Sequence, residues 1–277
     1  MYYKNQRVLL ASKHKKEKAI ADVFFNQLEC HVCVEDFDTD KFGTFTGEIE
    51  RPLTPYETCI LKARHAGEQF NYNLSVASEG SFGPHPSSPF IPSAHEIMVF
   101  IDKINDWIIA EQLVSHKTNY AMITVDKSTE LSVFLKCVGF PKHALVLQTK
   151  STHALVIKGI RTSSCLSSAL KQGFQADPYL LLSTDMRAMM NPTRMDVLSE
   201  LADKLAVRIG EHCPTCKTPG FGFKSTKGKL PCSICGLFTS LHEKEVWGCI
   251  QCDYYEARPR RDGLTGADPG CCNGCNP

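Results

Sequence analysis

CPTC at residues 213–216 begins a series of four Cys-x-x-Cys pairs, which continues with CSIC at 232–235, CIQC at 249–252 and CNGC at 272–275. Two thiolates three residues apart on a tight turn reach the same tetrahedral zinc ion, with Zn–S distances of about 2.3 Å. Two such pairs complete a structural site, so the series predicts a C-terminal ribbon or knuckle module with two structural zinc ions. The predicted ligands are Cys213, Cys216, Cys232, Cys235, Cys249, Cys252, Cys272 and Cys275.

The four pairs can share two ions in more than one order. We expect sequential pairing, because the first two pairs are separated by fifteen residues, as in common zinc ribbons. A cross-braced arrangement, which joins the first pair with the third and the second with the fourth, stays open. Cys271 directly precedes Cys272, and either thiol is a candidate ligand.

The cysteines would form disulfides in a secreted protein, but the N-terminal sequence MYYKNQRVLLASKHKKEK has no apolar run of signal-peptide length. No stretch of the chain approaches the roughly 20 apolar residues that cross a bilayer. We therefore expect a soluble protein of the reducing cytoplasm, with no membrane partner.

Length and composition predict two domains. The chain has 277 residues, of which 43% are hydrophobic, enough for one full-sized globular domain and a small appended one. We expect an α/β domain over residues 1–210 and the zinc module over residues 211–277. The formal net charge is only +1, so no global field attracts nucleic acid. Residues 213–262 hold a small excess of basic side chains, for which a solvated surface is the preferred explanation.

Apolar runs that alternate with helical patterns indicate an α/β fold before the cysteines. Thr54 and Glu57 form a capping box with proline at the first helical position, and Asn191-Pro192 begins the last helix. The expected strands are residues 7–11, 31–34, 74–77, 95–101, 107–114, 144–148, 154–158 and 179–183. The expected helices are residues 15–28, 54–71, 128–138, 163–172 and 191–210.

Polar side chains follow three of the expected strands, where ligands bind in α/β sheets. Ser12, His14 and Lys16 lie at a strand-to-helix junction that suits a phosphate, although a solvated face explains them too. Glu79 follows a buried strand and is a candidate ligand for Mg²⁺ or Mn²⁺, with His85 at the end of the same Gly/Pro-rich turn; an ordinary turn is the alternative.

The third segment, residues 185–194, places Arg187 and Arg194 around a helix N-terminus. Arginine forks suit the recognition of phosphate or of a base. Ordinary helix capping with an Asp-Arg pair is the alternative.

The helix that begins at Thr54 resembles a helix of the inosine/xanthosine triphosphate pyrophosphatases. In that family a Glu early in the helix and a Lys five residues later serve metal and phosphate, which implies these roles for Glu57 and Lys62. The junction with Ser12 and Lys16, the acidic-Gly strand end at Glu79 and the segment around Arg194 follow in the family's order. The resemblance implies a mixed-sheet, inosine-triphosphatase-like domain with Glu57 and Glu79 as catalytic residues.

The chain also resembles, over nearly its whole length, an uncharacterised bacterial family of unknown function. The shared phrases are Phe-Gly-Thr-Phe at 42–45, Glu-Gly-Ser-Phe-Gly-Pro-His-Pro at 79–86, Asp-Met-Arg-Ala at 185–188, Asn-Pro-Thr-Arg-Met at 191–195, Pro-Gly-Phe-Gly at 219–222 and the terminal Cys-Asn-Pro at 275–277. This resemblance implies no activity.

Two functions from different classes follow. The first is a metal-dependent phosphohydrolase acting on a nucleoside triphosphate or related phosphate ester, in which Lys16, Lys62 and Arg194 hold the phosphates, and Glu57 and Glu79 place the metal. The second is a non-catalytic zinc module that binds nucleic acid or protein through its basic residues. The sequence does not indicate an oligomeric state.

Overall fold

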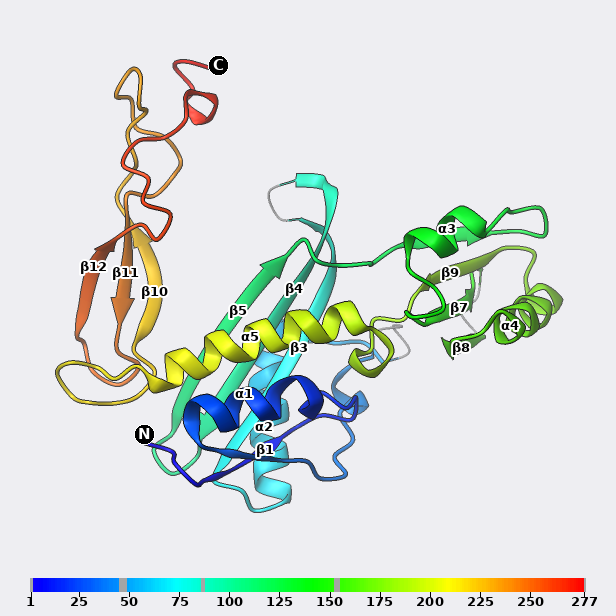
Figure 1. Ribbon diagram of the computed structural model, residues 1–277, viewed down its shortest axis with the longest axis horizontal. Coiled ribbons are helices and arrows are strands. Elements are labelled where there is room, and N and C mark those ends of the chain that lie inside the picture. Colours follow the sequence, from blue (N-terminus) through cyan, green and yellow to red (C-terminus); the bar gives the residue numbers. More distant parts are fainter. Residues whose placement is uncertain (1, 45–48, 86–87, 152–154, 277) are drawn as a thin grey trace. The chain divides into compact units, whose positions relative to one another are not determined.

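The computed structural model describes residues 2–44, 49–85, 88–151 and 155–276 (Figure 1). The chain divides into two compact units, Tyr3–Ala206 and the segment from Val207 onward, and Tyr2 belongs to the second. Phe45, Pro86 and Pro277 of the shared phrases lie outside the described residues, as does Ala154, where a strand was expected to begin.

The first unit contains a five-stranded mixed sheet with the order β2-β1-β3-β4-β5. β1 pairs in parallel with both β2 and β3, whereas β3, β4 and β5 form an antiparallel meander. The strands are β1 (Arg7–Leu10), β2 (His31–Cys33), β3 (Leu74–His85), β4 (Ser88–Asp102) and β5 (Trp107–Ser115). The mixed α/β architecture expected from the sequence is confirmed.

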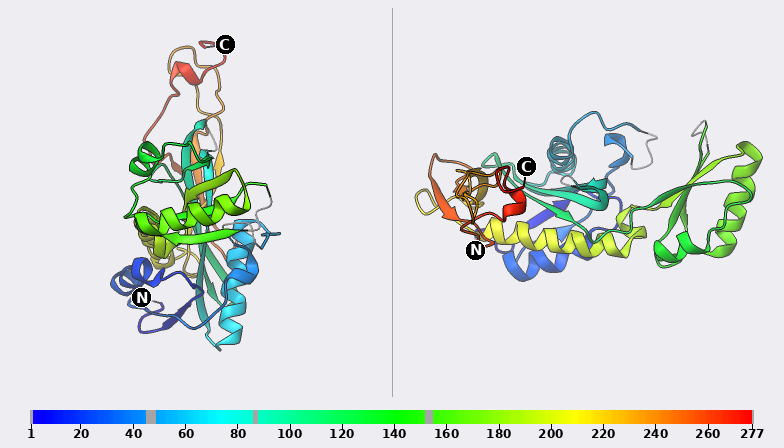
Figure 2. Two further views of the ribbon diagram at one scale, coloured as in Figure 1. Left: turned by 90° about the vertical axis from the view of Figure 1, so that its right-hand side faces the viewer. Right: turned by 90° about the horizontal axis from the view of Figure 1, so that it is seen from above.

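Helices cover both faces of this sheet, α2 (Pro55–Gln69) on one face and α1 (Glu17–Leu28) with α5 (Pro192–Gly210) on the other (Figure 2). Side chains alternate between the faces of a strand. Leu9 and Val99 accordingly share a core with Cys59 of α2, while the ring of Phe100 lies 6.5 Å from that of Phe24 in α1.

The predicted starts of α2 and α5 are confirmed, whereas the helix expected from residue 128 begins at Ser132. The Thr54 side chain accepts a hydrogen bond from the Glu57 backbone, and the Glu57 carboxylate accepts one in return, which completes the capping box of α2. The Asn191 side chain caps α5 by accepting from the backbone N–H of Arg194 at 3.0 Å. A 3₁₀ turn, η1 (Asp40–Phe42), precedes α2, and another, η2 (Ala188–Met190), precedes α5.

The first unit also holds a separate four-stranded sheet, antiparallel throughout, with the order β6-β9-β7-β8. Its core joins the strands to α3 (Ser132–Cys137) and α4 (Ser163–Ala176). The strands are β6 (Met122–Val125), β7 (Leu145–Thr149), β8 (Val156–Ile160) and β9 (Leu180–Thr184). β7 and β9 begin one residue later than the sequence pattern indicated, because pairing with neighbours and not the apolar run alone sets a strand's ends.

The second unit is built on a three-stranded antiparallel sheet with the order β10-β11-β12. Its elements are β10 (Gly222–Lys227), β11 (Lys244–Gly248), β12 (Tyr255–Pro259) and the 3₁₀ turn η3 (Pro269–Cys271). The cysteine pairs flank these strands.

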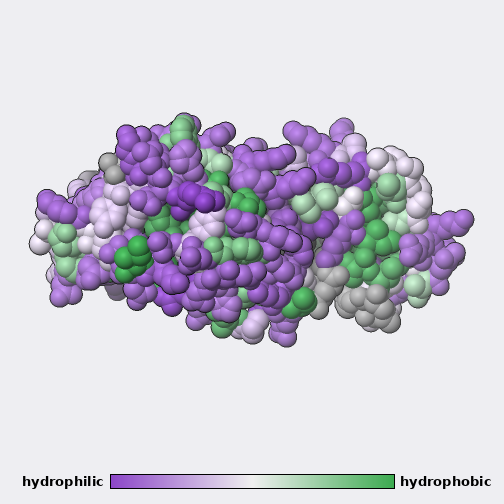
Figure 3. Space-filling model, turned by 90° about the horizontal axis from the view of Figure 1, so that it is seen from below, coloured by the Kyte–Doolittle hydropathy of each residue, from purple (hydrophilic) through white to green (hydrophobic). Residues whose placement is uncertain are grey.

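Among the described residues, no helix combines the length and apolar character needed to cross a membrane. Hydrophilic residues predominate on the face seen in Figure 3. Hydrophobic residues on that face gather over the part that carries the four-stranded sheet.

Candidate functional site

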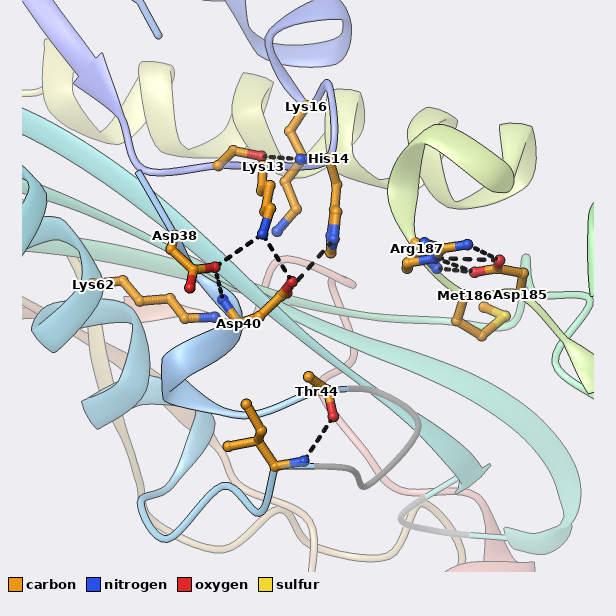
Figure 4. Close-up of polar contacts among 12 residues, drawn as sticks. Lys13, His14, Lys16, Asp38, Asp40, Thr44, Lys62, Asp185, Met186 and Arg187 are labelled. Atoms are coloured by element: carbon orange, nitrogen blue, oxygen red, sulfur yellow. Dashed lines mark hydrogen bonds and ion pairs between the residues drawn. The ribbon is translucent and has the colours of Figure 1, made fainter. Parts of the chain in front are cut away.

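A cavity of about 340 Å³, here called the central cavity, lies within the first unit (Figure 4). It brings together seven of the nine active-site residues predicted from the sequence, which are Ser12, His14, Lys16, Lys62, Glu79, Arg187 and Arg194. Its other charged lining residues are Asp40, Arg51, Lys158 and Asp185. The lining thus contains six Lys or Arg side chains and three carboxylates, a balance that favours an anionic ligand.

The loop from β1 to α1 supplies one wall of the central cavity. The Ser12 hydroxyl accepts a hydrogen bond from the His14 backbone at 3.2 Å, and this turn leads into the buried side chain of Lys16. Lys16 Nζ donates to the Ser78 carbonyl at 2.8 Å and to the Ser78 hydroxyl at 2.9 Å. Burial, with the charge of Arg194 adding to it, lowers the pKa of Lys16 from 10.5 to about 8. Lys16 is therefore a fixed cation at neutral pH.

Glu79 on β3 directly follows Ser78, the residue that accepts the hydrogen bonds of Lys16. It forms an ion pair with Lys62 of α2 through Oε1, and Arg51 Nη1 lies 3.4 Å from Oε2. Burial acts to raise the pKa of Glu79, but the positive charges of Lys62 and Lys16 outweigh it and hold the pKa below its usual value. Glu79 is therefore ionised at neutral pH.

His14 lies between the acidic and basic parts of the lining. Its Nε2 atom is 3.9 Å from an oxygen of Asp40, which is also held by Lys13 at 3.3 Å (Figure 4). Burial lowers the pKa of His14 from 6.5 to about 4, and the charge of Lys16 contributes in the same direction. The imidazole is therefore neutral at pH 7 and can both donate and accept a hydrogen bond.

Asp185 orients Arg187 at the edge of the four-stranded sheet. The Asp185 carboxylate is fully buried and accepts from Arg187 Nε at 3.0 Å, from Arg187 Nη2 at 2.6 Å, and from the backbone N–H of Gly159 at 3.1 Å. A guanidinium held on two atoms by a buried carboxylate has little freedom to rotate. Arg187 is thus pre-oriented toward the central cavity.

Arg194 is buried and makes more structural contacts than its position near a helix N-terminus indicated. Its Nε atom donates to Glu96 of β4 at 2.6 Å, Nη2 donates to the same carboxylate at 3.2 Å, and Nη1 donates to the Met186 carbonyl. Its guanidinium also lies 5.0 Å from the centre of the Phe82 ring. Arg194 therefore lines the cavity as part of a buried ion pair with Glu96.

Two residues predicted for the site lie outside the cavity lining. Glu57 is exposed and occupies the capping box of α2, one of the two interpretations its pattern allowed. His85 lies near the end of β3, where its ring stacks on that of His116 with centroids 4.6 Å apart.

Four charged residues at the site escaped the sequence analysis. Arg51 and Asp40 come from the irregular stretch between β2 and α2, where no periodic pattern indicates which side chains face inward. Lys158 lies inside a strand, and Glu96 is a buried charge within an otherwise apolar run. A charged residue in such a run was the one available signal, because charges are rarely buried without a partner.

The eight predicted metal ligands form two groups in the second unit, but sequential pairing is wrong. Each group places its four Sγ atoms within 4.8 Å of one another. The first group contains the first and third pairs, Cys213, Cys216, Cys249 and Cys252, and the second contains the second and fourth pairs, Cys232, Cys235, Cys272 and Cys275. The arrangement is cross-braced.

Strand direction explains the cross-bracing. Gly222 at the start of β10 pairs with Gly248 at the end of β11, which brings the first and third cysteine pairs to one end of the sheet. Lys244 at the start of β11 pairs with Pro259 at the end of β12, so the second and fourth pairs meet at the other end. Counting residues between cysteines could not show this, because the intervening strands carry the chain along the whole sheet.

Both groups are placed to hold a metal ion. The Sγ–Sγ separations are 3.7 Å for Cys213 and Cys252 and 3.5 Å for Cys216 and Cys249, too long for a disulfide. The corresponding separations in the second group are 3.9 and 3.5 Å. Cys272 is buried in its group, whereas Cys271 is exposed and outside it, which decides between these neighbours.

The arginines of the second unit have local partners. Arg258 pairs with Glu256, Arg260 with Asp262, and Arg261 with Glu245. The guanidinium carbons of Arg258 and Arg261 also lie 4.2 and 4.5 Å from the centre of the Trp247 ring. These pairs neutralise much of the basic character that the sequence showed here.

Comparison with known proteins identifies one family. No curated protein matches the chain. A family model, described as a domain of unknown function, matches residues 62–277. The match includes Lys62, Glu79 and all eight metal-binding cysteines, whereas the loop with Lys16 precedes it. The expected membership of an uncharacterised family is confirmed, and the chain belongs to the family described as domain of unknown function DUF6671.

Proposed function

We propose that the first unit is a metal-dependent phosphohydrolase that acts on a nucleoside triphosphate or a related phosphate ester. The observation that carries this proposal is the central cavity, in which six Lys and Arg side chains face three carboxylates. Phosphoryl transfer depends mainly on positioning and on neutralising charge, which such a lining supplies. The neutral His14 and ionised Glu79 add groups that exchange protons with, or bind, a polar ligand.

The residues divide into two roles. Lys16 and Lys62, with Arg187 from the opposite wall, bind the phosphate oxygens. Glu79 serves as the carboxylate for a divalent ion, which Mg²⁺ or Mn²⁺ fits because such ions take one or two carboxylates together with substrate phosphates. That ion would supply charge neutralisation at the phosphates. Glu79 now pairs with Lys62 and Arg51. An ion bound at Glu79 would release both cations to bind the phosphates.

The resemblance to the inosine/xanthosine triphosphate pyrophosphatases supports the proposal independently. The family order of a Ser/Lys junction, a Lys-bearing helix, an acidic strand end and an Arg before a helix appears here as Ser12 and Lys16, Lys62, Glu79 and Arg194. The structure brings these residues to one cavity. Glu57, which the resemblance also implied, is left out of the proposed mechanism because it lies in the capping box.

We also propose that the two cysteine groups hold structural zinc. Four sulfur atoms about 2.3 Å from a central ion lie about 3.8 Å apart in a regular tetrahedron, close to the separations observed. Four thiolates fill all the coordination positions of a tetrahedral ion, so such a site has no open position for a substrate. One ion at each end would hold together a small sheet whose apolar core is short and built around Phe221.

The alternative function, a zinc module that binds nucleic acid or protein, draws on fewer observations. Its arginines are paired with carboxylates, which lowers the charge available to a polyanion. Lys224 and Lys227 remain exposed on β10. This function is therefore the outcome we would adopt if the first unit proves inactive.

The test is release of phosphate or pyrophosphate from a panel of normal and deaminated nucleoside triphosphates with Mg²⁺ or Mn²⁺. We expect turnover by the wild type and its loss in Glu79→Gln. Glu57→Gln is the matched control, because Gln also completes a capping box and the residue lies outside the cavity. Zinc content is measured in all three proteins. Equal loss in both variants, or no turnover on any nucleotide, would remove the proposal.

A further inference from the structure

A second cavity, here called the methionine cavity, lies in the first unit beside the central one and is absent from the proposed mechanism. Its volume is about 470 Å³. It is lined by Met189, Met190 and Met195, with Lys15, Lys18 and Arg161 as its cations. Among the described residues of the lining, Asp196 is the one acidic side chain. A cavity of this size with an apolar lining and a few convergent charges has the composition of a small-molecule site.

In the loop between β1 and α1, consecutive side chains line different cavities. His14 and Lys16 line the central cavity, whereas Lys15 between them lines the methionine cavity. Lys15 has a φ of 55°, in the left-handed region that a Lys adopts only at some cost. This conformation gives one short loop two cationic sides. The two cavities are therefore distinct sites with a common wall.

The N-terminal ends of two helices add to the positive potential that the side chains create in the methionine cavity. Lys18 lies in the first turn of α1 and Pro192 is the first residue of α5, so two long helices present their N-terminal ends to the lining. Helix N-termini carry a partial positive charge. Within the described chain, no side chain caps α1 at Lys16. An anion near Lys15 and Lys18 would meet both the ammonium groups and this helix end.

The rest of the lining suits an aromatic ring. Met189, Met190 and Met195 are all half-buried. Thioethers are flexible and polarisable, and they make favourable contacts with aromatic rings. Arg161 is held near the methionines because its Nη2 atom donates to the Met189 carbonyl at 2.8 Å. Cations therefore lie beside the methionines in one cavity.

We propose that the methionine cavity is a second ligand site, which binds a nucleoside monophosphate with its phosphate at Lys15, Lys18 and Arg161 and its base against the methionines. The site does not depend on catalysis in the central cavity, and it stands or falls separately from the proposed function.

The test is a titration of full-length protein, labelled at its methionine methyl groups, with adenosine 5′-monophosphate observed by NMR. We expect the methyl signals of Met189, Met190 and Met195 to shift together along one binding curve. Ribose 5-phosphate and adenosine, each lacking one half of the ligand, should bind more weakly than the nucleotide. If ribose 5-phosphate shifts these signals as strongly as the nucleotide at the same concentration, the base contact is wrong. If the nucleotide shifts none of the three, the site itself is wrong.

Charge reversal at Lys18 provides the variant. Lys18 is exposed, so Lys18→Glu should fold, and we expect it to weaken nucleotide binding about tenfold, equivalent to about 1.4 kcal/mol. Lys171→Glu is the matched control, because Lys171 is exposed on α4 and lines neither cavity. Equal affinities in the two variants would overturn the proposal. The wild-type titration decides the question even if Lys18→Glu does not fold.

Discussion

Glu96 and Arg194 form a buried ion pair that ties the centre of the mixed sheet to the first turn of α5. The Glu96 side chain is fully buried and that of Arg194 is 8% exposed, with Arg194 Nε 2.6 Å from Glu96 Oε1. Arg194 also donates to the Met186 carbonyl in the segment that carries Arg187. One buried pair thus fixes β4, α5 and one wall of the central cavity relative to each other.

We expect Glu96→Gln to destabilise the first unit by about 3 kcal/mol, because breaking a buried pair leaves an uncompensated charge. The measurement is urea unfolding followed by Trp107 fluorescence in a Trp247→Phe background, so that the signal reports the first unit alone. Glu200→Gln is the control, since Glu200 pairs with Lys117 at the surface and should contribute about 1 kcal/mol or less. Equal losses of unfolding free energy in the two variants would show that the buried pair does not hold β4 and α5 together.

Gly80 should tolerate no side chain, because it lies against this ion pair. A Cβ atom at Gly80 would be 2.6 Å from Arg194 Nη2 and 2.6 Å from Glu96 Oε1. We expect Gly80→Ala to cost about 1–3 kcal/mol, as overpacking does. Gly83→Ala on the same strand is the control, because a Cβ there meets nothing within 4 Å. The same urea experiment measures both, and a stable Gly80→Ala would contradict the close packing.

The sequence predicted local structure well and long-range pairing poorly. Capping chemistry placed the starts of α2 and α5, since Thr54 and Asn191 act on backbone groups within three residues. The contacts of Arg194 with Glu96 and of Asp185 with the Gly159 backbone were not predictable, because these partners are distant in sequence and nothing local selects them. The cysteine ligands followed from spacing, whereas their grouping required knowing that three strands separate the pairs.

The site shows the same division. Glu79 and Lys16 were identified because each follows an apolar run, which is a local pattern. The expected turn after residue 77 was wrong, however, since β3 continues through Glu79 to His85. Arg51 was not, because it lies in an irregular segment and reaches Glu79 only through the tertiary fold. Glu57 matched a motif in sequence, but the same spacing satisfies a capping box, and spacing alone cannot choose between these uses.

Lys16 should make stability depend on pH above neutrality. Its pKa in the folded protein, about 8, is below the usual 10.5, so between these values the unfolded chain holds a proton that the folded chain has lost. Stability rises with pH wherever the unfolded state binds more protons. The wild type should therefore gain stability relative to Lys16→Met as the pH rises from 8 to 10. Parallel curves for the two proteins would contradict the lowered pKa.

The same titration should act in the opposite direction on phosphate binding. Above pH 8 Lys16 becomes neutral, and the central cavity loses one of its cations. We expect affinity for inorganic tripolyphosphate, measured by calorimetry, to fall as the pH rises through 8. In Lys16→Arg the fall should move to higher pH, because a guanidinium keeps its proton. An unshifted profile in this variant would assign the fall to another group.

Cross-bracing predicts how zinc is lost when two cysteines are replaced together. Cys213 and Cys249 belong to one group, so Cys213→Ser/Cys249→Ser should destroy one site and retain one zinc ion per chain. Cys213 and Cys235 belong to different groups, so Cys213→Ser/Cys235→Ser should damage both sites. Sequential pairing would give the reverse result in each case, which makes the two double variants controls for each other.

Metal analysis of the purified proteins by mass spectrometry measures this directly. Cys271→Ser should retain both ions, because Cys271 lies outside the two groups. Since folding of such units is coupled to metal binding, a chelator should unfold the second unit and leave the urea transition of the first, reported by Trp107, in place. Loss of the Trp107 transition on chelation would show that the first unit also depends on the metal.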